Sequence, residues 1–90
     1  MLAVLGFIIL FFPIGNTILN RMMHIATITD ISNLVRARRK ELALTQADAA
    51  GLCGVGVRFW SELENGKESL HIGKVLTVLS RLGIVLRAEY

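Results

Sequence analysis

The chain has 90 residues, which is enough for one domain and barely enough for a self-sufficient hydrophobic core. This length excludes a second domain and leaves room for help from a partner subunit. The net charge is +3 and the isoelectric point is about 9.6, a basic balance that fits an anionic partner such as nucleic acid without identifying one.

The charged residues are confined to one part of the chain. Residues 1–20 have no charged side chain, so all ten Lys and Arg and all seven Asp and Glu lie between Arg21 and Glu89. Cys53 is the single cysteine, which excludes an internal disulfide and favours a reducing compartment. We interpret it as a small buried apolar residue.

Residues 1–21 form a separate apolar segment. Spanning a bilayer takes roughly 20 apolar residues, so Leu2–Leu19 is marginal as a membrane helix. A signal peptide fits no better, because nothing basic precedes the run and no cleavage pattern follows it. Three interpretations remain open: translation that starts at Met22 or Met23, a membrane segment, and an ordered segment that covers an apolar surface. The predicted domain comprises residues 22–90.

Two capping boxes mark the starts of the first two predicted helices. Thr27 with Asp30, and Thr45 with Asp48, have the spacing at which a hydroxyl and a carboxylate satisfy free backbone amides. The first helix is expected to run to about residue 42 and carries the basic cluster Arg36–Lys40. Its apolar positions repeat at the helical period: Ile31, Leu34, Val35 and Leu42.

Glycines bound the next two helices. A short alanine-rich helix stops at Gly54, and Gly56 is an acceptable N-cap for the third helix. The third helix ends at Asn65–Gly66, since these residue types accept the left-handed backbone that terminates helices. Two short helices joined by a segment with two glycines are typical of a helix-turn-helix.

A fourth helix and two β-prone segments complete the domain. The fourth helix begins near His71 and stops at Gly83, with one apolar face formed by Ile72, Val75, Leu76, Leu79 and Leu82. Residues 84–90 alternate like a half-buried strand, and residues 24–29 are also β-prone. The expected fold class is therefore mainly all-α, with four to five helices and a short C-terminal β-strand.

The third helix is expected to divide its residues between the core and an exposed face. Trp60 and Leu63 are three residues apart, so they share one face, which must turn inward. The opposite side then carries Val57, Arg58, Ser61 and Glu62. Such a face near a helix N-terminus can enter the major groove of B-DNA.

Two residues of that face have side chains suited to particular bases. Arg58 can bond guanine O6 and N7, a contact that discriminates by about 1–3 kcal/mol, and Val57 can touch a thymine methyl group. Glu62 can accept from cytosine N4 or simply repel the wrong phosphate register. Phe59 can flank the core or lie against the sugar-phosphate wall, and we favour the core because an exposed Phe is costly.

The stretch 44–67, LTQADAAGLCGVGVRFWSELENGK, resembles the helix-turn-helix of the phage-repressor (XRE/Cro) family. The matching positions are Thr45-Gln46, Ala50, Gly54-Val55 and Leu63-Glu64-Asn65-Gly66-Lys67. The likeness covers about residues 27–89, and RARRKELALTQ, RFWSELENGK and VLTVLSRLGIVLRAE are most similar to HipB-type antitoxins. The resemblance implies a lambda-repressor-like domain in a homodimeric repressor that controls its own operon and binds a HipA-like kinase toxin.

The resemblance also implies roles for individual residues. Gln46 would bond a DNA phosphate, and an ion pair between Arg39 and Glu64 would hold the third helix against the first. The base-facing positions would be Gly56, Val57, Arg58, Ser61 and Glu62. Asn65 and Lys67 would meet the DNA backbone beyond them. Apart from the resemblance, we expect one or two of the basic residues 36–40 to contact phosphate as well, with Arg36 and Lys40 as the candidates. The strand that pairs across the dimer would comprise Ile84, Val85, Leu86, Arg87, Ala88, Glu89 and Tyr90.

Two positions depart from the family pattern. Ala43 stands where the family commonly has Gly, so a left-handed residue there would cost about 1 kcal/mol unless the turn differs. Gly56 replaces the usual Ser or Thr N-cap and so lacks a side chain that would often reach a phosphate. Residues 1–21 have no counterpart in the pattern.

The expected function is sequence-specific repression of transcription, in the cytoplasm at the nucleoid, by a homodimer on an inverted-repeat operator in double-stranded DNA. A HipB-like antitoxin role is compatible with it. The alternatives are a stand-alone XRE-type repressor without a toxin and a membrane-tethered regulator. No enzyme activity, cofactor or metal ion is expected, because His24 and His71 have no carboxylate or nucleophile at fixed spacing and Cys53 has no basic neighbour.

Overall fold

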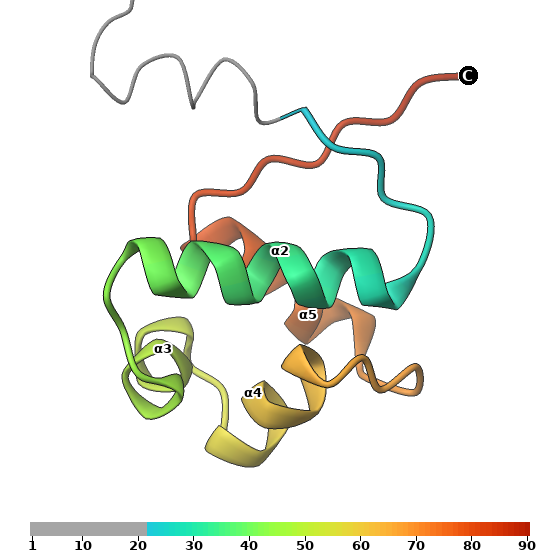
Figure 1. Cartoon of the computed structure of the whole chain (residues 1–90). Coiled ribbons are helices and arrows are strands. Elements are labelled where there is room, and N and C mark those ends of the chain that lie inside the picture. The colour runs from blue at the N-terminus through green and yellow to red at the C-terminus, as the bar shows by residue number, and fades with distance from the viewer. Residues whose placement is uncertain (1–21) are drawn as a thin grey trace, which may run out of the picture.

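The computed structural model describes residues 22–90, which form four helices (Figure 1). In chain order these are α2 (Ile28–Glu41), α3 (Gln46–Cys53), α4 (Val57–Glu64) and α5 (Ile72–Arg81). The predicted four-helix domain is confirmed, whereas Leu2–Leu19 and the rest of segment 1–21 lie outside the described residues. Within residues 22–90, no helix has the length and apolar character needed to cross a membrane.

Side-chain caps start three of the four helices. Thr27 and Thr45 each accept from the amide three residues on, and the acidic residue there reciprocates, so both predicted capping boxes are present. His71 starts α5 as predicted, with its Nδ1 accepting a first-turn amide at 3.3 Å. α4 follows Gly56, which supplies no side-chain cap, so the amides of its first turn remain open.

The core lies between α2, α5 and the two short helices. Its fully buried side chains are Val35, Ala49, Ala50, Cys53, Trp60, Leu63, Val75, Val78, Leu79 and Leu82. The alanines allow α4 to approach α3 closely, and Trp60 fills the largest volume. Burial raises the pKa of the Cys53 thiol, as expected for a cysteine that packs as an apolar residue.

Three apolar side chains predicted to line the core are exposed. Leu42 is the C-cap of α2, beyond the last helical residue, so it leaves the buried stripe of that helix. On α5 the buried stripe is narrower than predicted, because no element of residues 22–90 covers the side that carries Ile72 and Leu76.

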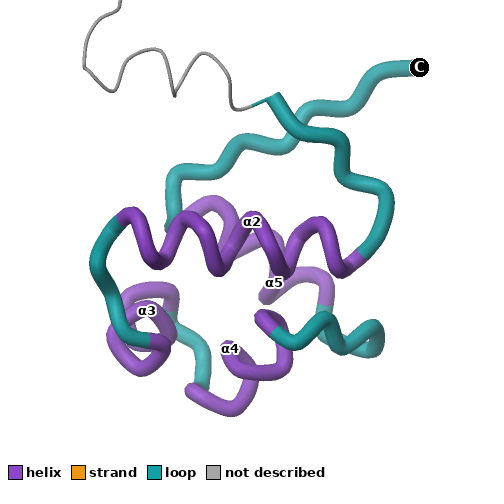
Figure 2. Tube along the Cα trace, viewed as in Figure 1, coloured by secondary structure: helices purple, strands orange, loops and turns teal. Residues whose placement is uncertain are grey.

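The β-prone segments form no strand within the described chain (Figure 2). Residues 22–27 and 84–90 both lie on the α2 side of the helices, opposite α4 (Figure 1). Ile84 packs partly on the core, but Val85 and Leu86 are exposed. A strand needs a neighbour for its backbone groups, so the half-buried strand predicted for residues 84–90 does not form in the isolated chain. Pairing between two chains stays a prediction.

The turn after α2 adopts a left-handed conformation at a residue that is not glycine. Ala43 has φ 58°, whereas the turns after α3 and α4 use Gly54 and Gly66 at φ 72° and 78°. The Cβ of alanine disfavours this region by about 1 kcal/mol. The sequence left open a strained left-handed residue or a different turn, and the structure has the strained left-handed residue, Ala43.

Replacing Ala43 with Gly should therefore raise the free energy of unfolding by roughly 1 kcal/mol, measured by urea denaturation. The control is Ala37→Gly, at an exposed position inside α2, which should lower stability by about 0.5–1 kcal/mol. Destabilisation by both substitutions would contradict the left-handed turn.

Candidate nucleic-acid interface

α4 presents one face to the core and the opposite face to solvent. Trp60 and Leu63 are 0% exposed, whereas Val57 is 53% exposed and the side chain of Arg58 is 91% exposed. The structure therefore agrees with the inward and outward faces that the spacing of these residues predicted. Ser61 is half-buried on the same helix.

The N-terminal end of α4 is open. A Cβ added at Gly56 would have nothing within 4 Å, and the first turn of α4 contains no acidic residue. Free backbone amides and the helix dipole both favour an anion at such an end.

Phe59 is half-buried against the core, with the Lys74 ammonium 5.8 Å from its ring centroid, which agrees with the core interpretation.

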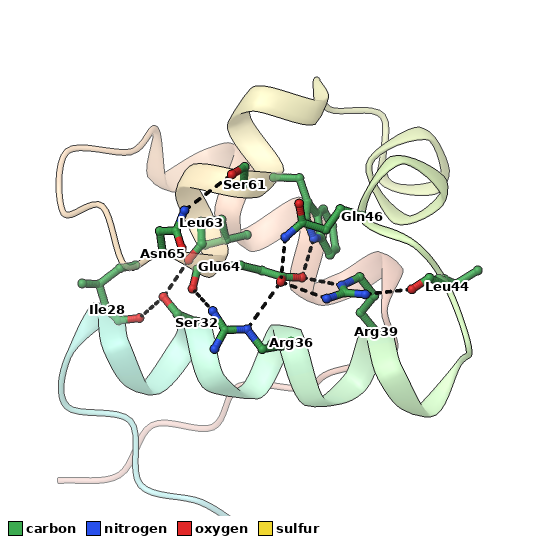
Figure 3. A network of polar contacts seen from close by, with 11 residues as sticks. Ile28, Ser32, Arg36, Arg39, Leu44, Gln46, Ser61, Leu63, Glu64 and Asn65 are labelled. Atoms are coloured by element: carbon green, nitrogen blue, oxygen red, sulfur yellow. Dashed lines mark hydrogen bonds and ion pairs between the residues drawn. The ribbon is translucent and has the colours of Figure 1, made fainter.

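A buried carboxylate fixes α4 against α2 and α3 (Figure 3). Glu64 is 3% exposed and accepts from Arg39 at 2.6 and 3.1 Å, from Gln46 at 3.0 Å and from the Trp60 indole at 2.6 Å. The ion pair that the resemblance implied between Arg39 and Glu64 is thus present. These donors belong to three helices, so one carboxylate holds all three together. With Arg36, these residues are called the Glu64 cluster.

Glu64 and Arg39, the ion pair of the Glu64 cluster, are both charged at neutral pH. Burial raises the pKa of the Glu64 carboxyl, but hydrogen bonds from Arg39, Gln46 and Trp60 outweigh burial and lower the pKa to about 2. The hydrogen bond to Glu64 in turn raises the pKa of Arg39. Both partners are therefore stabilised in their charged forms.

Two further side chains tie α2 to the C-terminal end of α4. Arg36 donates through Nη2 to the Glu64 carbonyl at 2.7 Å, and its Nε lies 3.5 Å from the Glu64 carboxylate. Ser32 Oγ lies 2.6 Å from the Leu63 carbonyl and 2.9 Å from the Ile28 carbonyl, so its single proton serves one of them at a time. These contacts satisfy carbonyls that a helix end leaves open. The sequence analysis missed both roles.

The residues predicted to contact phosphate fall into two groups. Gln46 and Arg36 belong to the Glu64 cluster, so a phosphate would have to share them with Glu64. Lys40, Asn65 and Lys67 lie at the surface, and the Asn65 amide is 3.5 Å from Ser61 Oγ. The structure thus brings only part of the predicted set together.

A second set of charged side chains lies along the exposed face of α4. Glu62 Oε2 lies 3.1 Å from Lys67 Nζ and 3.5 Å from Arg58 Nε. The hydrogen bond from Lys67 is the main cause that lowers the pKa of Glu62; burial opposes it, and the charges of Lys67 and Arg58 lower the pKa further. These three residues are called the Glu62 triad. The spacing of four residues between Arg58 and Glu62 was a sequence signal for their pairing.

Replacing Glu64 with Gln should remove roughly 3 kcal/mol of stability at pH 7, because the depressed pKa means that folding favours the charged carboxylate. The wild-type protein should keep this contribution above about pH 4.5 and lose it progressively as pH falls toward 2. Denaturation curves of both proteins across this range measure the difference. Glu68→Gln, at an exposed carboxylate, is the control and should leave the pH dependence unchanged. A Glu64→Gln protein with the wild-type pH dependence would contradict the assignment.

The sequence of the chain is similar to those of a known protein family. The family model described as helix-turn-helix domain matches residues 30–89. The uncharacterized HTH-type transcriptional regulator y4mF of Sinorhizobium fredii is 54% identical over 60 residues, which cover 67% of this chain and 79% of that protein.

Comparison with solved structures agrees with the fold. A chain of a HipA–HipB–O2–O3 complex and a chain described as MDT protein each match with a TM-score of 0.69 and 19% sequence identity. Each match covers 77% of this chain and 97% of the other. With two thirds of its length matched by the family model and a regulator of the same type as a relative, the chain belongs to the helix-turn-helix domain family and is an HTH-type transcriptional regulator.

Proposed function

We propose that the protein is a sequence-specific DNA-binding repressor whose helix α4 reads bases in the major groove. The observation that carries this proposal is the division of α4, with Trp60 fully buried and Arg58 91% exposed two residues earlier. The Glu64 cluster fixes this division, so the outward face is presented by a rigid scaffold. Repression would take place in the cytoplasm, at the nucleoid.

The exposed side of α4 supplies chemistry suited to base edges. The Nη1 and Nη2 atoms of Arg58 can donate to O6 and N7 of guanine, and the exposed Val57 can contact a thymine methyl group. Gly56 allows the helix end to approach DNA closely, because no side chain intervenes. Ser61 and Glu62 complete the proposed base-facing set, one turn further along.

The proposed phosphate contacts flank this base-reading face. They comprise Gln46, Asn65, Lys67, Lys40 and Arg36. The amide nitrogen of Gln46 carries two protons, so it can keep its bond to Glu64 and donate the second proton to a phosphate. Phosphate contacts of this kind set the register of a protein on DNA but carry no sequence information.

We propose that two copies bind together through the C-terminal segment. Ile84–Tyr90 leaves the helices on the side opposite α4 and exposes Val85 and Leu86, which pairing with a second copy would cover. A two-fold dimer of this kind would place two α4 helices on half-sites about one helical turn apart, so the operator should be an inverted repeat.

A second candidate role is that of an antitoxin. The fold is shared with a chain of a HipA–HipB–O2–O3 complex, which supports testing a HipA-like kinase as a partner. Coexpression with a HipA-like kinase encoded beside this gene should give a complex that survives gel filtration. If no complex forms, the antitoxin role is dismissed, the alternative of a stand-alone repressor is favoured, and the DNA-binding proposal stands unchanged.

Replacing Arg58 with Ala should weaken binding to a site selected from a randomised duplex library about ten- to a hundredfold, because a bidentate guanine contact is lost. Binding to random DNA should weaken only a few-fold, since base contacts add little there. Fluorescence anisotropy titrations with both duplexes measure this difference. The control is Lys74→Ala, which also removes one positive charge, from α5, and should change the affinity for both duplexes by the same factor. Equal losses on the two duplexes for Arg58→Ala would dismiss Arg58 as a base reader.

A further inference from the structure

Glu62 lies in the middle of the face of α4 that remains exposed. Arg58, one turn earlier, and Lys67, beyond the helix end, both approach the same oxygen of Glu62, at 3.5 and 3.1 Å. The carboxylate therefore lies between two cations, and only 28% of the Glu62 side chain is exposed. A carboxylate on a surface that meets DNA would otherwise be repelled by phosphates.

The turn after α4 holds one of these cations in place. The Lys67 amide donates to the Glu62 carbonyl at 3.1 Å, and the Gly66 amide donates to the Leu63 carbonyl at 3.2 Å. This pair of bonds is the Schellman motif, which fixes the backbone at a helix end. The Schellman motif thereby fixes the backbone of Lys67, whose ammonium lies 3.1 Å from Oε2 of the Glu62 carboxylate.

The other cation, the Arg58 guanidinium, meets Glu62 at its Nε edge. Glu62 comes closest to Arg58 at Nε, at 3.5 Å, and within residues 22–90 Arg58 has no other ionic partner, while 91% of its side chain is exposed. A free arginine side chain samples many rotamers and loses that freedom when it binds. A neighbour that restrains Nε removes part of this cost and restricts the direction from which the guanidinium meets a base.

We propose that Glu62 is a positioning residue that holds the Nε edge of Arg58, so that the terminal edge of the guanidinium selects guanine opposite the first turn of α4. This inference rests on the proposed function, in which α4 enters the major groove. It differs from direct reading of cytosine, in which Glu62 itself would accept from a base: Lys67 and Arg58 both approach Oε2 of the carboxylate, which leaves only Oε1 for such a contact. The ligand is thus duplex DNA with a guanine at the position that Arg58 reaches.

The test compares Glu62→Gln with Glu68→Gln in the full chain. Both substitutions remove one negative charge, but Glu68 lies in the exposed loop after Lys67, beyond the end of α4. Each protein is titrated with the duplex that the wild type selects and with the same duplex carrying 7-deazaguanine at the guanine sensitive to Arg58→Ala. The preference for guanine over its analogue should fall about three- to tenfold in Glu62→Gln. Glu68→Gln should keep the wild-type preference.

A double-mutant cycle shows whether the effect passes through Arg58. In an Arg58→Ala background, Glu62→Gln should cause no further loss of guanine preference. The NMR signal of the Arg58 Nε–H should also shift in Glu62→Gln and not in Glu68→Gln, while the unfolding temperatures of the two variants stay similar. If Glu62 had a purely structural role, Glu62→Gln would lower the unfolding temperature, and its effect on the guanine preference would be the same with and without Arg58.

Several results would overturn the inference. An equal loss of preference with and without Arg58 would do so, as would an unchanged preference in Glu62→Gln. A lost preference at a cytosine would instead assign Glu62 as a direct base reader. If the wild-type protein enriches no sequence at all, the proposed function fails and the inference fails with it. Enrichment by the wild type with an unaffected Glu62→Gln variant overturns this inference alone.

Discussion

The arrangement of helices α2, α3 and α4 depends on one buried carboxylate. Glu64 receives hydrogen bonds from Arg39 on α2, Gln46 on α3 and Trp60 on α4 itself. A buried charge is costly unless it is paired and hydrogen-bonded, so an arrangement that separated these donors would leave Glu64 unsatisfied. The hydrophobic core supplies most of the stability, and the carboxylate specifies which relative position of the helices is allowed.

This constraint connects packing to recognition. Trp60 places its ring in the core and Glu64 accepts hydrogen bonds from α2 and α3, so α4 cannot rotate about its axis without losing that burial and those bonds. The exposed side of α4 is thereby fixed, with Arg58 in its first turn and Glu62 one turn on. Sites that act on a ligand need this kind of support, because a loosely held helix would present its side chains in many directions. The same carboxylate also holds Gln46, at the start of α3, in a fixed position relative to α4.

Local signals in the sequence predicted the parts of the fold that depend on neighbouring residues. The capping boxes at Thr27 and Thr45 and the inward side of α4 could be derived because caps and helical spacing act over three or four residues. The exposure of Ile72 and Leu76 could not, because periodicity does not say which part of an apolar stripe another element covers.

The candidate site was predictable to a similar extent. The exposed face of α4 followed from helical spacing, whereas the contact of Arg36 with the end of α4 depends on how the two helices cross. The conformation of residues 84–90 was also beyond local reasoning, since a strand depends on a neighbouring strand, and residues 22–90 of one chain supply none. A cluster of basic residues such as 36–40 shows where cations lie, and only the packing shows which of them are engaged inside the protein.

The central claim is that Glu64 holds α4 with Trp60 inside and Arg58 toward DNA. The most direct measurement is NMR of the isotopically labelled chain, free and bound to its selected duplex. The account predicts contacts between major-groove protons and the side chains of Val57 and Arg58, while the Trp60 indole N–H stays protected from exchange in both states. A Trp60 indole that exchanges freely, or DNA contacts that fall on α5 instead of α4, would contradict it.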